Sequence, residues 1–347
     1  MRAVIKTAKG YDQMELVEID EPTATKNLVK IKVAYSGICG TDLHAFSGSY
    51  SSTMTPVILG HEFSGIVTEI GPDVKKVRVG DRVTSETTFT TCGQCIYCQT
   101  KDYNLCSNRQ GLGTQVNGSM SQWILSREES VHILPDNVSL LSAVLTEPLA
   151  CGVHACIEKA DIKAGNTICV FGAGAIGLLL SQVAKAKGAT VILAGISTDA
   201  ERFKIGKKIG VDCTIDQMQQ NINEKVGSMT KGIGVDMVFE CSGAIAALNK
   251  GLEIVKKKGK VIQMGVFAEA QMKVATDLIL NKEIEYIGSR SQKPSTWEKS
   301  IALLKDGLVV PEMIVTKISP LEDWREAFES AIRGEGVKAV IQCNDDM

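Results

Sequence analysis

The chain has 347 residues, of which 44% are hydrophobic and 22% are charged, and its formal net charge is −2. This length favours two domains, since a single domain usually has about 100 to 200 residues, and this composition excludes a largely disordered chain. The basic residues form no cluster, so we expect neither nucleic acid nor an anionic membrane surface as a partner.

The N-terminus and the cysteines indicate a reducing compartment. The segment 1–7 turns polar too early for a signal peptide, and no run approaches the roughly 20 apolar residues of a membrane span. Eleven cysteines in a chain of this size indicate metal-bound and free thiols better than a disulfide framework. We therefore expect a cytoplasmic protein that does not bind membranes.

Residues 1 to about 146 contain short β-like runs punctuated by Gly and Pro, a pattern typical of a compact, mostly-β domain. The expected strands are Ala3–Ile5, Val29–Ala34, Phe63–Ile70, Arg82–Ser85 and Trp123–Ser126. Between them, the stretch 37–71 gathers a thiol (Cys39), an imidazole (His61) and a carboxylate (Glu62) among small residues. These groups are ligands of first-row metals, so the stretch predicts half of a metal site.

Four cysteines, Cys92, Cys95, Cys98 and Cys106, lie in one fifteen-residue loop. Four thiolates close a tetrahedron around one ion, so the spacing predicts a structural zinc site that leaves no coordination position open. The alternatives are unligated thiols or two disulfides. The expected lobe covers residues 90–108, where the ion stiffens a loop that lacks its own core.

Glu147 precedes Pro148 in an otherwise apolar stretch. A carboxylate there is costly unless it faces a metal or a polar partner. Alternatively, it is a surface acid at the start of a helix whose first residue is Pro148. The sequence alone leaves both interpretations open.

From about residue 168, apolar runs alternate with helical stretches, which is typical of a doubly wound parallel sheet in an α/β domain. The expected strands are 168–171, 190–194, 212–215, 236–240, 260–264 and 285–288. After the first of them, Gly172-Ala-Gly174-Ala175-Ile176-Gly177 opens a helix expected over 175–187. Strand, glycine pattern and helix together predict a dinucleotide site whose pyrophosphate lies at the helix N-terminus.

The second strand of this domain ends at Gly195, where an NAD site usually carries Asp or Glu. Ser197, Thr198 and Arg202 follow, so hydroxyls and a cation stand where a 2'-phosphate lies in NADP sites. Thr198 and Glu201 also fit a capping box, and both interpretations can hold. The cofactor is therefore expected to be NAD or NADP, with a lean toward NADP.

The other histidines and cysteines carry less information. His132 and His154 belong to no ligand-spaced cluster and are interpreted as structural. Cys241, after the fourth strand of the parallel sheet, is expected to line the cofactor through its backbone. The remaining thiols are interpreted as inert core residues; they are Cys151, Cys156, Cys169, Cys213 and Cys343.

The order of these motifs resembles that of zinc-dependent medium-chain alcohol and polyol dehydrogenases over essentially the whole chain. The resemblance implies a GroES-like catalytic domain formed by residues 1–150 and 289–347, and a Rossmann domain formed by residues 151–288. Glu147 stands where classical alcohol dehydrogenases have a cysteine ligand, which is similar to the sorbitol dehydrogenase branch.

The resemblance also implies roles for individual residues. Cys39 and His61 would bind the catalytic metal, zinc or another divalent ion, and Glu62 and Glu147 would bind it directly, through water or by exchange. Thr41 would contact the substrate oxygen and His44 would pass its proton outward. Lys338 matches a basic position that helps to hold the pyrophosphate.

Several stretches, among them 80–89 and 288–294, resemble bacterial pentitol-phosphate dehydrogenases of the D-arabitol-phosphate type. A phosphorylated substrate needs a cation, for which Arg290 is the first candidate and Lys293 and Arg109 are weaker ones. The alternatives are a free-polyol dehydrogenase of the sorbitol type and a non-catalytic dinucleotide-sensing scaffold. A homodimer or homotetramer is expected.

Overall fold

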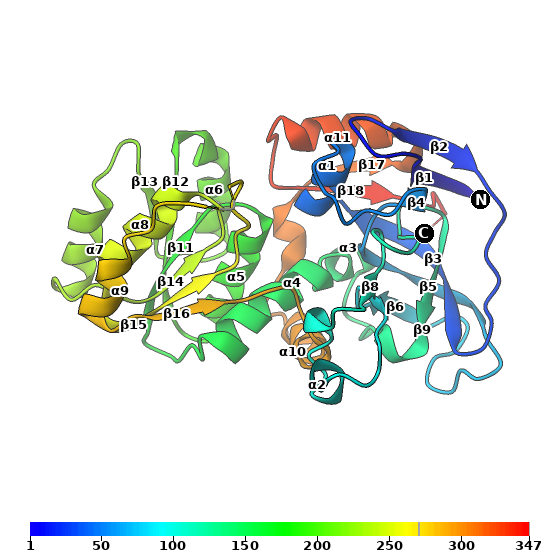
Figure 1. Cartoon of the computed structure of the whole chain (residues 1–347), viewed down its shortest axis with the longest axis horizontal. Helices are drawn as coiled ribbons and strands as arrows, with labels where there is room; N and C mark the ends of the chain where they lie inside the picture. The colour runs from blue at the N-terminus through cyan, green and yellow to red at the C-terminus, as the bar shows by residue number, and fades with distance from the viewer. Residues whose placement is uncertain (270, 347) are drawn as a thin grey trace. The chain divides into compact units, whose positions relative to one another are not determined.

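The computed structural model describes residues 1–269 and 271–346, which form two compact units. Unit 1 comprises Met1–Glu147, Gln292–Lys305 and Val315–Met347, and unit 2 comprises Pro148–Ser291 and Asp306–Ile314. Each unit has its own hydrophobic core. Figure 1 shows the helices and strands of both units and labels most of them.

Unit 1 is built on antiparallel sheets. The largest has seven strands in the order β10-β6-β5-β3-β18-β17, with β9 also paired to β3, and only β17 and β18 run parallel. Its strands are β3 (Leu28–Gly37), β5 (Glu62–Ile70), β6 (Arg82–Ser85), β9 (Trp123–Arg127), β10 (Val131–Ile133), β17 (Val315–Pro320) and β18 (Lys338–Gln342). The smaller sheets contain β1 (Arg2–Lys6), β2 (Met14–Glu18) and β4 (Val57–Ile58), and β7 (Thr88–Thr90) with β8 (Gln110–Gly111).

Alternation of apolar residues explains why these strands form. In β3, Val29, Ile31 and Val33 are fully buried and point to one face, as the two-residue period of a strand requires. The helices around the sheets are α1 (Gly40–Phe46), α2 (Ile96–Gln99), α3 (Leu140–Ala143), α10 (Pro294–Lys305) and α11 (Trp324–Ile332), with 3-10 turns η1 (Tyr103–Leu105), η2 (Glu128–Ser130) and η6 (Leu321–Asp323). The helix α4 (Thr146–Val153) begins in unit 1 and continues in unit 2.

Unit 2 contains one parallel sheet of six strands in the order β13-β12-β11-β14-β15-β16. Figure 1 shows this sheet in the middle of the unit with helices around it. The strands are β11 (Thr167–Phe171), β12 (Thr190–Gly195), β13 (Cys213–Asp216), β14 (Val235–Glu240), β15 (Val255–Gln263) and β16 (Glu285–Gly288). The order reverses at β11, which is the point where doubly wound sheets bind their ligands.

The helices of unit 2 pack against this sheet through their apolar sides. The α5 helix (Ala175–Ala186) buries Leu178, Leu179 and Val183 completely. The other helical segments are a π-helix η3 (His154–Lys159), a 3-10 turn η4 (Ser197–Asp199), α6 (Ala200–Lys208), α7 (Ile222–Thr230), α8 (Ile245–Ile254), α9 (Thr276–Lys282) and η5 (Pro311–Ile314). The mostly-β and doubly wound α/β classes expected from the sequence are therefore confirmed.

One stretch lies in a different unit from the one predicted. Residues 306–314 were expected in the catalytic domain with the rest of the C-terminal tail, but they belong to unit 2. A hydrogen bond from the Val310 N–H to Gln182 Oε1 (2.8 Å), a buried side chain of α5, holds this segment there. The other unit boundaries, at 147/148 and 291/292, lie three residues from the predicted ones.

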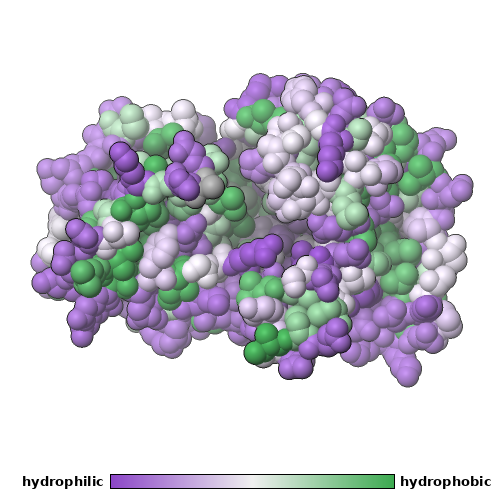
Figure 2. Space-filling view, viewed as in Figure 1, coloured by the Kyte–Doolittle hydropathy of each residue, from purple (hydrophilic) through white to green (hydrophobic). Residues whose placement is uncertain are grey.

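No helix among the described residues has the length and apolar character that crossing a bilayer requires. On the face shown in Figure 2, hydrophilic and hydrophobic residues are interspersed over both units.

Candidate metal centre and dinucleotide site

Unit 1 brings together three of the predicted metal ligands. One donor atom each from Cys39, His61 and Glu62 lies within 4.8 Å of the other two. Cys39 precedes α1, His61 follows Gly60, whose φ is +91°, and Glu62 begins β5. Sulfur, nitrogen and oxygen donors at such separations fit a divalent ion of the zinc type, with ligand bonds of about 2.0–2.3 Å after small side-chain movements.

Asp42 ties the two ligand-bearing segments together, although it was not among the predicted site residues. Its Oδ2 accepts a hydrogen bond from the Cys39 N–H (2.9 Å), and its Oδ1 accepts one from the Gly60 N–H (3.2 Å). The same Oδ1 lies 3.8 Å from His61 Nδ1. The signal was the three-residue spacing between Cys39 and Asp42, which is that of a capping box.

The pKa values of His61 and Asp42 depend on burial and on the charge of the other residue. Burial by itself would lower the pKa of His61, but the charges of Asp42 and Cys39 outweigh it and hold that pKa well above the usual range. Burial raises the pKa of Asp42, although the His61 ring opposes this effect. His61 Nδ1 and Asp42 Oδ1 are too far apart, at 3.8 Å, for a hydrogen bond, so the carboxylate acts on the imidazole through its charge.

Glu62 also contacts a residue predicted for another site. The Lys338 Nζ lies 2.5 Å from Glu62 Oε2 and donates to the Ile38 carbonyl at 2.8 Å. Both side chains are buried, and the pKa of Lys338 is raised because Glu62 outweighs the effect of burial. Lys338 is therefore bound within unit 1, and its predicted contact with the pyrophosphate stays a prediction.

Glu147 is buried with this cluster, but its carboxylate is outside the group of three whose donors lie within 4.8 Å. Burial raises the pKa of Glu147 to about 7, with a further increase from Glu62, while His61, Lys338 and Arg109 act in the opposite direction. The surface-acid alternative is therefore wrong. Of the two predicted carboxylates, Glu62 is the one beside Cys39 and His61 in this structure.

The two predicted proton-relay residues lie on α1. The Thr41 hydroxyl is 3.8 Å from the Cys39 sulfur, so it is next to the candidate metal ligands. His44 is exposed one turn later, and its Nδ1 lies 3.3 Å from the Ser49 hydroxyl. An inner hydroxyl and an outer imidazole on one helix are arranged in the order that a relay to solvent needs.

The four cysteines of the lobe converge, with one sulfur from each within 4.8 Å of the others. Neighbouring sulfurs are 3.5–3.8 Å apart and all four thiols are free, so the disulfide alternative is wrong. Backbone N–H groups of Gln94 and Cys95 lower the pKa of Cys92 to about 6, which favours a thiolate. The donor set fits a structural zinc ion.

In unit 2, the glycine pattern lies between β11 and α5 as predicted. Gly172 has φ +100°, and a side chain there would meet the Ser242 backbone at 3.0–3.1 Å. A Cβ at Gly177 would lie 2.0 Å from the Gly172 carbonyl oxygen, whereas Gly174, which caps α5, has open space around it. This geometry gives a tight turn, close helix packing and room for a phosphate at Ala175 and Ile176, the first residues of the helix.

The hydroxyl and the cation predicted near the cofactor ribose are bonded to carboxylates. The Ser197 hydroxyl donates to Asp216 Oδ2 (2.7 Å), and the Arg202 Nη1 lies 3.3 Å from Asp199 Oδ1. Thr198 is exposed beside them. The predicted capping role of Thr198 is not seen, because Asp199 is the N-cap residue of α6; it makes no side-chain cap bond there, and its carboxylate accepts from the Ile196 N–H.

The three predicted phosphate-binding cations have different surroundings. Arg109 donates from Nε to the Thr88 hydroxyl (2.9 Å) and from Nη2 to the Thr87 hydroxyl (2.7 Å), and its charge acts on Glu147. Lys293 lies 2.7 Å from Asp102 Oδ1, beside the cysteine lobe. Arg290 is exposed in unit 2. Arg109 is thus the candidate whose charge acts on the buried carboxylate Glu147.

The residues interpreted as structural have ordinary structural contacts. His132 stacks on Trp297 with ring centroids 5.4 Å apart, and its Nε2 lies 3.0 Å from Glu86 Oε1. His154 lies 3.2 Å from Glu158 in the π-helix.

Burial raises the pKa of Cys156, Cys169, Cys213, Cys241 and Cys343, the last to about 12, so these thiols are protonated at neutral pH.

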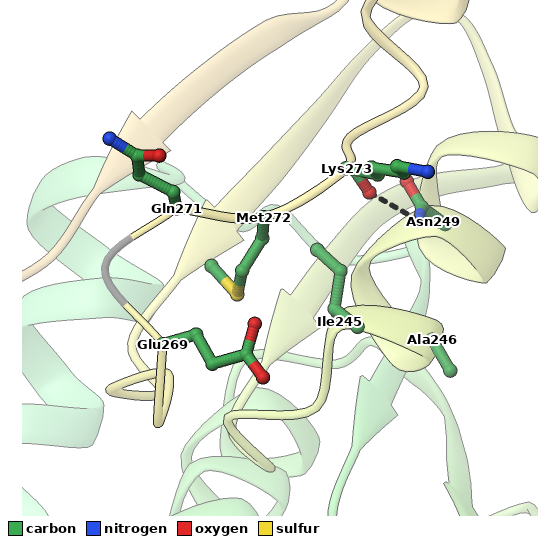
Figure 3. A pocket seen from close by; sticks show the side chains of 7 residues that line it. All are labelled: Ile245, Ala246, Asn249, Glu269, Gln271, Met272 and Lys273. Atoms are coloured by element: carbon green, nitrogen blue, oxygen red, sulfur yellow. Dashed lines mark hydrogen bonds between the residues drawn. The ribbon is translucent and has the colours of Figure 1, made fainter.

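A separate pocket of about 710 Å³ lies in unit 2 at the start of α8 (Figure 3). Its lining consists of Ile245, Ala246, Asn249, Glu269, Gln271, Met272 and Lys273, none of which is a predicted site residue. The Asn249 side chain donates to the Lys273 carbonyl (3.0 Å) and accepts from the Ala275 N–H (2.9 Å). These bonds fasten the segment that forms one wall of the pocket.

A dinucleotide fold joined in one chain to a Cys–His–Glu cluster and a four-cysteine lobe defines a zinc-type dehydrogenase. Comparisons with known proteins agree with this class. Residues 25–136 match the alcohol dehydrogenase GroES-like domain, and residues 175–306 match the zinc-binding dehydrogenase domain. The chain belongs to the zinc-dependent medium-chain alcohol dehydrogenase family, which confirms the resemblance seen in the sequence.

Individual relatives cover nearly the whole chain. The chain is 49% identical to a D-arabitol-phosphate dehydrogenase from Enterococcus avium, over 100% of this chain and 98% of the relative. It is 45% identical to a sorbitol dehydrogenase from Halalkalibacterium halodurans, over 98% and 99%. The structure of a 2R,3R-butanediol dehydrogenase from Bacillus subtilis superposes with a TM-score of 0.89 at 30% identity, over 99% of each chain.

Proposed function

We propose that this enzyme interconverts a secondary alcohol of a polyol phosphate, of the D-arabitol-phosphate type, and the corresponding ketose phosphate, with NAD or NADP as the hydride carrier. The observation that carries this proposal is the 49% identity to a D-arabitol-phosphate dehydrogenase over the full chain. Arg109, a guanidinium held beside a buried carboxylate, is consistent with it because guanidinium groups suit phosphate better than other cations do.

The proposed reaction removes a proton from the hydroxyl oxygen and a hydride from the carbinol carbon, and leaves a ketone. Cys39, His61 and Glu62 would hold a divalent ion, with Glu147 as the exchanging or water-linked carboxylate. Such an ion supplies Lewis acidity that eases loss of the hydroxyl proton, and a nicotinamide accepts the hydride.

The remaining steps fall to side chains of this chain. Asp42 fixes the Cys39 and Gly60 backbone, and so sets the direction of the first two ligands. The Thr41 hydroxyl would take the substrate proton and His44, exposed on the same helix, would release it to water. Arg109 would bind the phosphate and fix which carbon of the substrate reacts.

A second candidate function is oxidation of a free polyol of the sorbitol type. It is favoured by the 45% identity to a sorbitol dehydrogenase and by the fact that Lys293 already pairs with Asp102. In that case Arg109 would serve only as an electrostatic partner of Glu147.

The two candidates are separated by turnover of D-arabitol phosphate, free D-arabitol and sorbitol, each with NAD and with NADP. We expect kcat/KM for the phosphate ester to exceed that of both free polyols by roughly 100-fold or more, since a charged bidentate contact contributes about 3 kcal/mol. Arg109→Met should remove most of this advantage and leave turnover of the free polyols within about threefold. Higher kcat/KM for the free polyols in the wild type would instead establish the second candidate.

A further inference from the structure

We infer that Asp199 makes this chain select NAD over NADP, although the strand position that usually carries the selecting acid is Gly195. The inference rests on the proposed nicotinamide-dependent function and names the residue that discriminates between the two cofactors. It reverses the lean toward NADP that the sequence suggested, and every residue in it belongs to unit 2.

The first observation is where the Asp199 carboxylate lies. Gly195 is the last residue of β12, and a Cβ built on it would be 2.5 Å from Asp199 Oδ2 and 3.0 Å from the Phe203 ring. In dinucleotide folds an Asp or Glu at the end of this strand binds the ribose 2'-hydroxyl. Asp199, four residues later, therefore places a carboxylate in the space where the usual acidic side chain begins.

The second observation is that this carboxylate is fixed. Its Oδ2 accepts a hydrogen bond from the Ile196 N–H (3.1 Å), and its Oδ1 lies 3.3 Å from the Arg202 guanidinium. Only 9% of the Asp199 surface is exposed. A buried acid with a backbone bond keeps its position when a ligand arrives, so it acts as a preorganised acceptor.

The third observation concerns the groups that were expected to bind a 2'-phosphate. Asp216 is the register partner of Gly195 in the neighbouring strand, and it accepts the Ser197 hydroxyl at 2.7 Å and the Met218 N–H at 2.9 Å. The Ser197 hydroxyl is thus already bonded to Asp216, and the Arg202 guanidinium is already paired with Asp199. Asp199 lies against Gly195 and Asp216 is its register partner, and of these two carboxylates only Asp199 is paired with Arg202, so the end of β12 carries an excess negative charge, which attracts a hydroxyl donor and repels a phosphate dianion.

The test measures the dissociation constants of NADH and NADPH by titration, with nicotinamide fluorescence as the readout and no substrate present. We expect wild-type protein to bind NADH at least about tenfold more tightly than NADPH, and Asp199→Asn to reduce this ratio by about tenfold or more. Glu201→Gln is the matched control, because it removes a negative charge two residues after Asp199, in the first turn of α6, while its side chain is 79% exposed. Its ratio should stay within about twofold of wild type.

Asp199→Ser, which keeps an acceptor for the Ile196 N–H, covers the case in which the asparagine variant misfolds. Wild-type protein that binds NADPH as tightly as NADH overturns the inference while leaving the proposed function intact. An unchanged ratio in a folded Asp199 variant equally overturns the role of this residue. Folded wild-type protein that binds neither cofactor overturns the proposed function itself, and the inference with it.

Discussion

The ammonium group of Lys338 lies 2.5 Å from the carboxylate of Glu62, and both side chains are almost completely buried. The two residues come from neighbouring regions of one sheet, since β18 pairs with the end of β3 and β3 pairs with β5. Gly37 makes room for the pair, because a Cβ at this position would lie 2.3 Å from Glu62 Oε2. The carboxylate beside Cys39 and His61 is therefore held by a cation of the same unit.

This burial predicts that Lys338 stabilises metal-free protein strongly. Lys338→Met should lower the free energy of unfolding by about 3–5 kcal/mol, because Glu62 is left buried without its partner. Urea denaturation in the presence of a chelator measures this change. The double variant with Glu62→Leu should recover part of the lost free energy of unfolding. If the effects of the two substitutions simply add, Lys338 and Glu62 are not energetically coupled.

The matched control for Lys338 is Lys32, whose partner Asp346 is 70% exposed. Lys32→Met should cost less than about 1 kcal/mol, as solvent-exposed ion pairs usually do. If Lys32→Met and Lys338→Met lower the free energy of unfolding by the same amount, burial does not decide how much the Lys338 pair contributes to stability.

The bonds of Asp42 predict a loss of metal affinity when its charge is removed. Asp42→Asn keeps the shape of the side chain but leaves one acceptor oxygen for the Cys39 and Gly60 N–H groups, so one of these bonds is lost, and it removes the negative charge near His61. Loss of such a supporting group usually costs about 10–100-fold in metal affinity. Zinc affinity measured with a competing chelator should fall by that factor, with far-ultraviolet circular dichroism unchanged.

Glu298, exposed on α10, provides the comparison for Asp42. Glu298→Gln should keep wild-type zinc affinity. If Asp42→Asn also keeps it, the carboxylate has no part in orienting the ligands.

Much of the fold and part of the site could be predicted because their signals are local. The glycine pattern at Gly172 has one structural meaning once a strand precedes it and a helix follows it. The four lobe cysteines are likewise close in sequence, so their convergence needs no knowledge of the fold.

Other features depend on side chains that only the folded chain brings together. The partner of Ser197 was not evident from the sequence, because Asp216 lies in another strand, and the approach of the Asp199 carboxylate to Gly195 depends on how the chain turns after β12. The Lys338 contact with Glu62 joins residues almost three hundred positions apart. Such pairings have no periodicity or motif that a linear pattern displays.

The cysteine lobe predicts a second metal ion whose loss destabilises the chain. Cys95→Ser should reduce bound zinc by about one equivalent and lower the melting temperature, because a structural ion contributes folding free energy directly. Metal analysis after dialysis, combined with a thermal melt, measures both effects. Cys213→Ser, which changes a half-buried thiol outside the two clusters, should leave the zinc content unaltered. Unchanged zinc content in Cys95→Ser would mean that the lobe holds no ion.

We expect Glu128, which is remote from the metal ligands in sequence, to make a pH-dependent contribution to the free energy of unfolding. Burial by itself would raise the pKa of this carboxyl, but hydrogen bonds from the Lys76 and Lys75 N–H groups outweigh burial and leave the pKa below its usual range. A carboxyl whose folded pKa is depressed stabilises the fold above its unfolded pKa of about 4.3, and this contribution is lost as the pH falls through the lower, folded value.

Glu128→Gln should therefore reduce the free energy of unfolding by about 1.5–3 kcal/mol at pH 7, the usual contribution of hydrogen bonds to a charged acceptor. The difference from wild type should shrink as the pH falls below about 4.3, as measured by urea denaturation at a series of pH values. Glu129, the exposed neighbour that accepts from Asn27, is the control, and Glu129→Gln should change stability by less than about 0.5 kcal/mol at any pH. A difference for Glu128→Gln that stays constant with pH would show that the bonds to Lys75 and Lys76 do not depend on its charge.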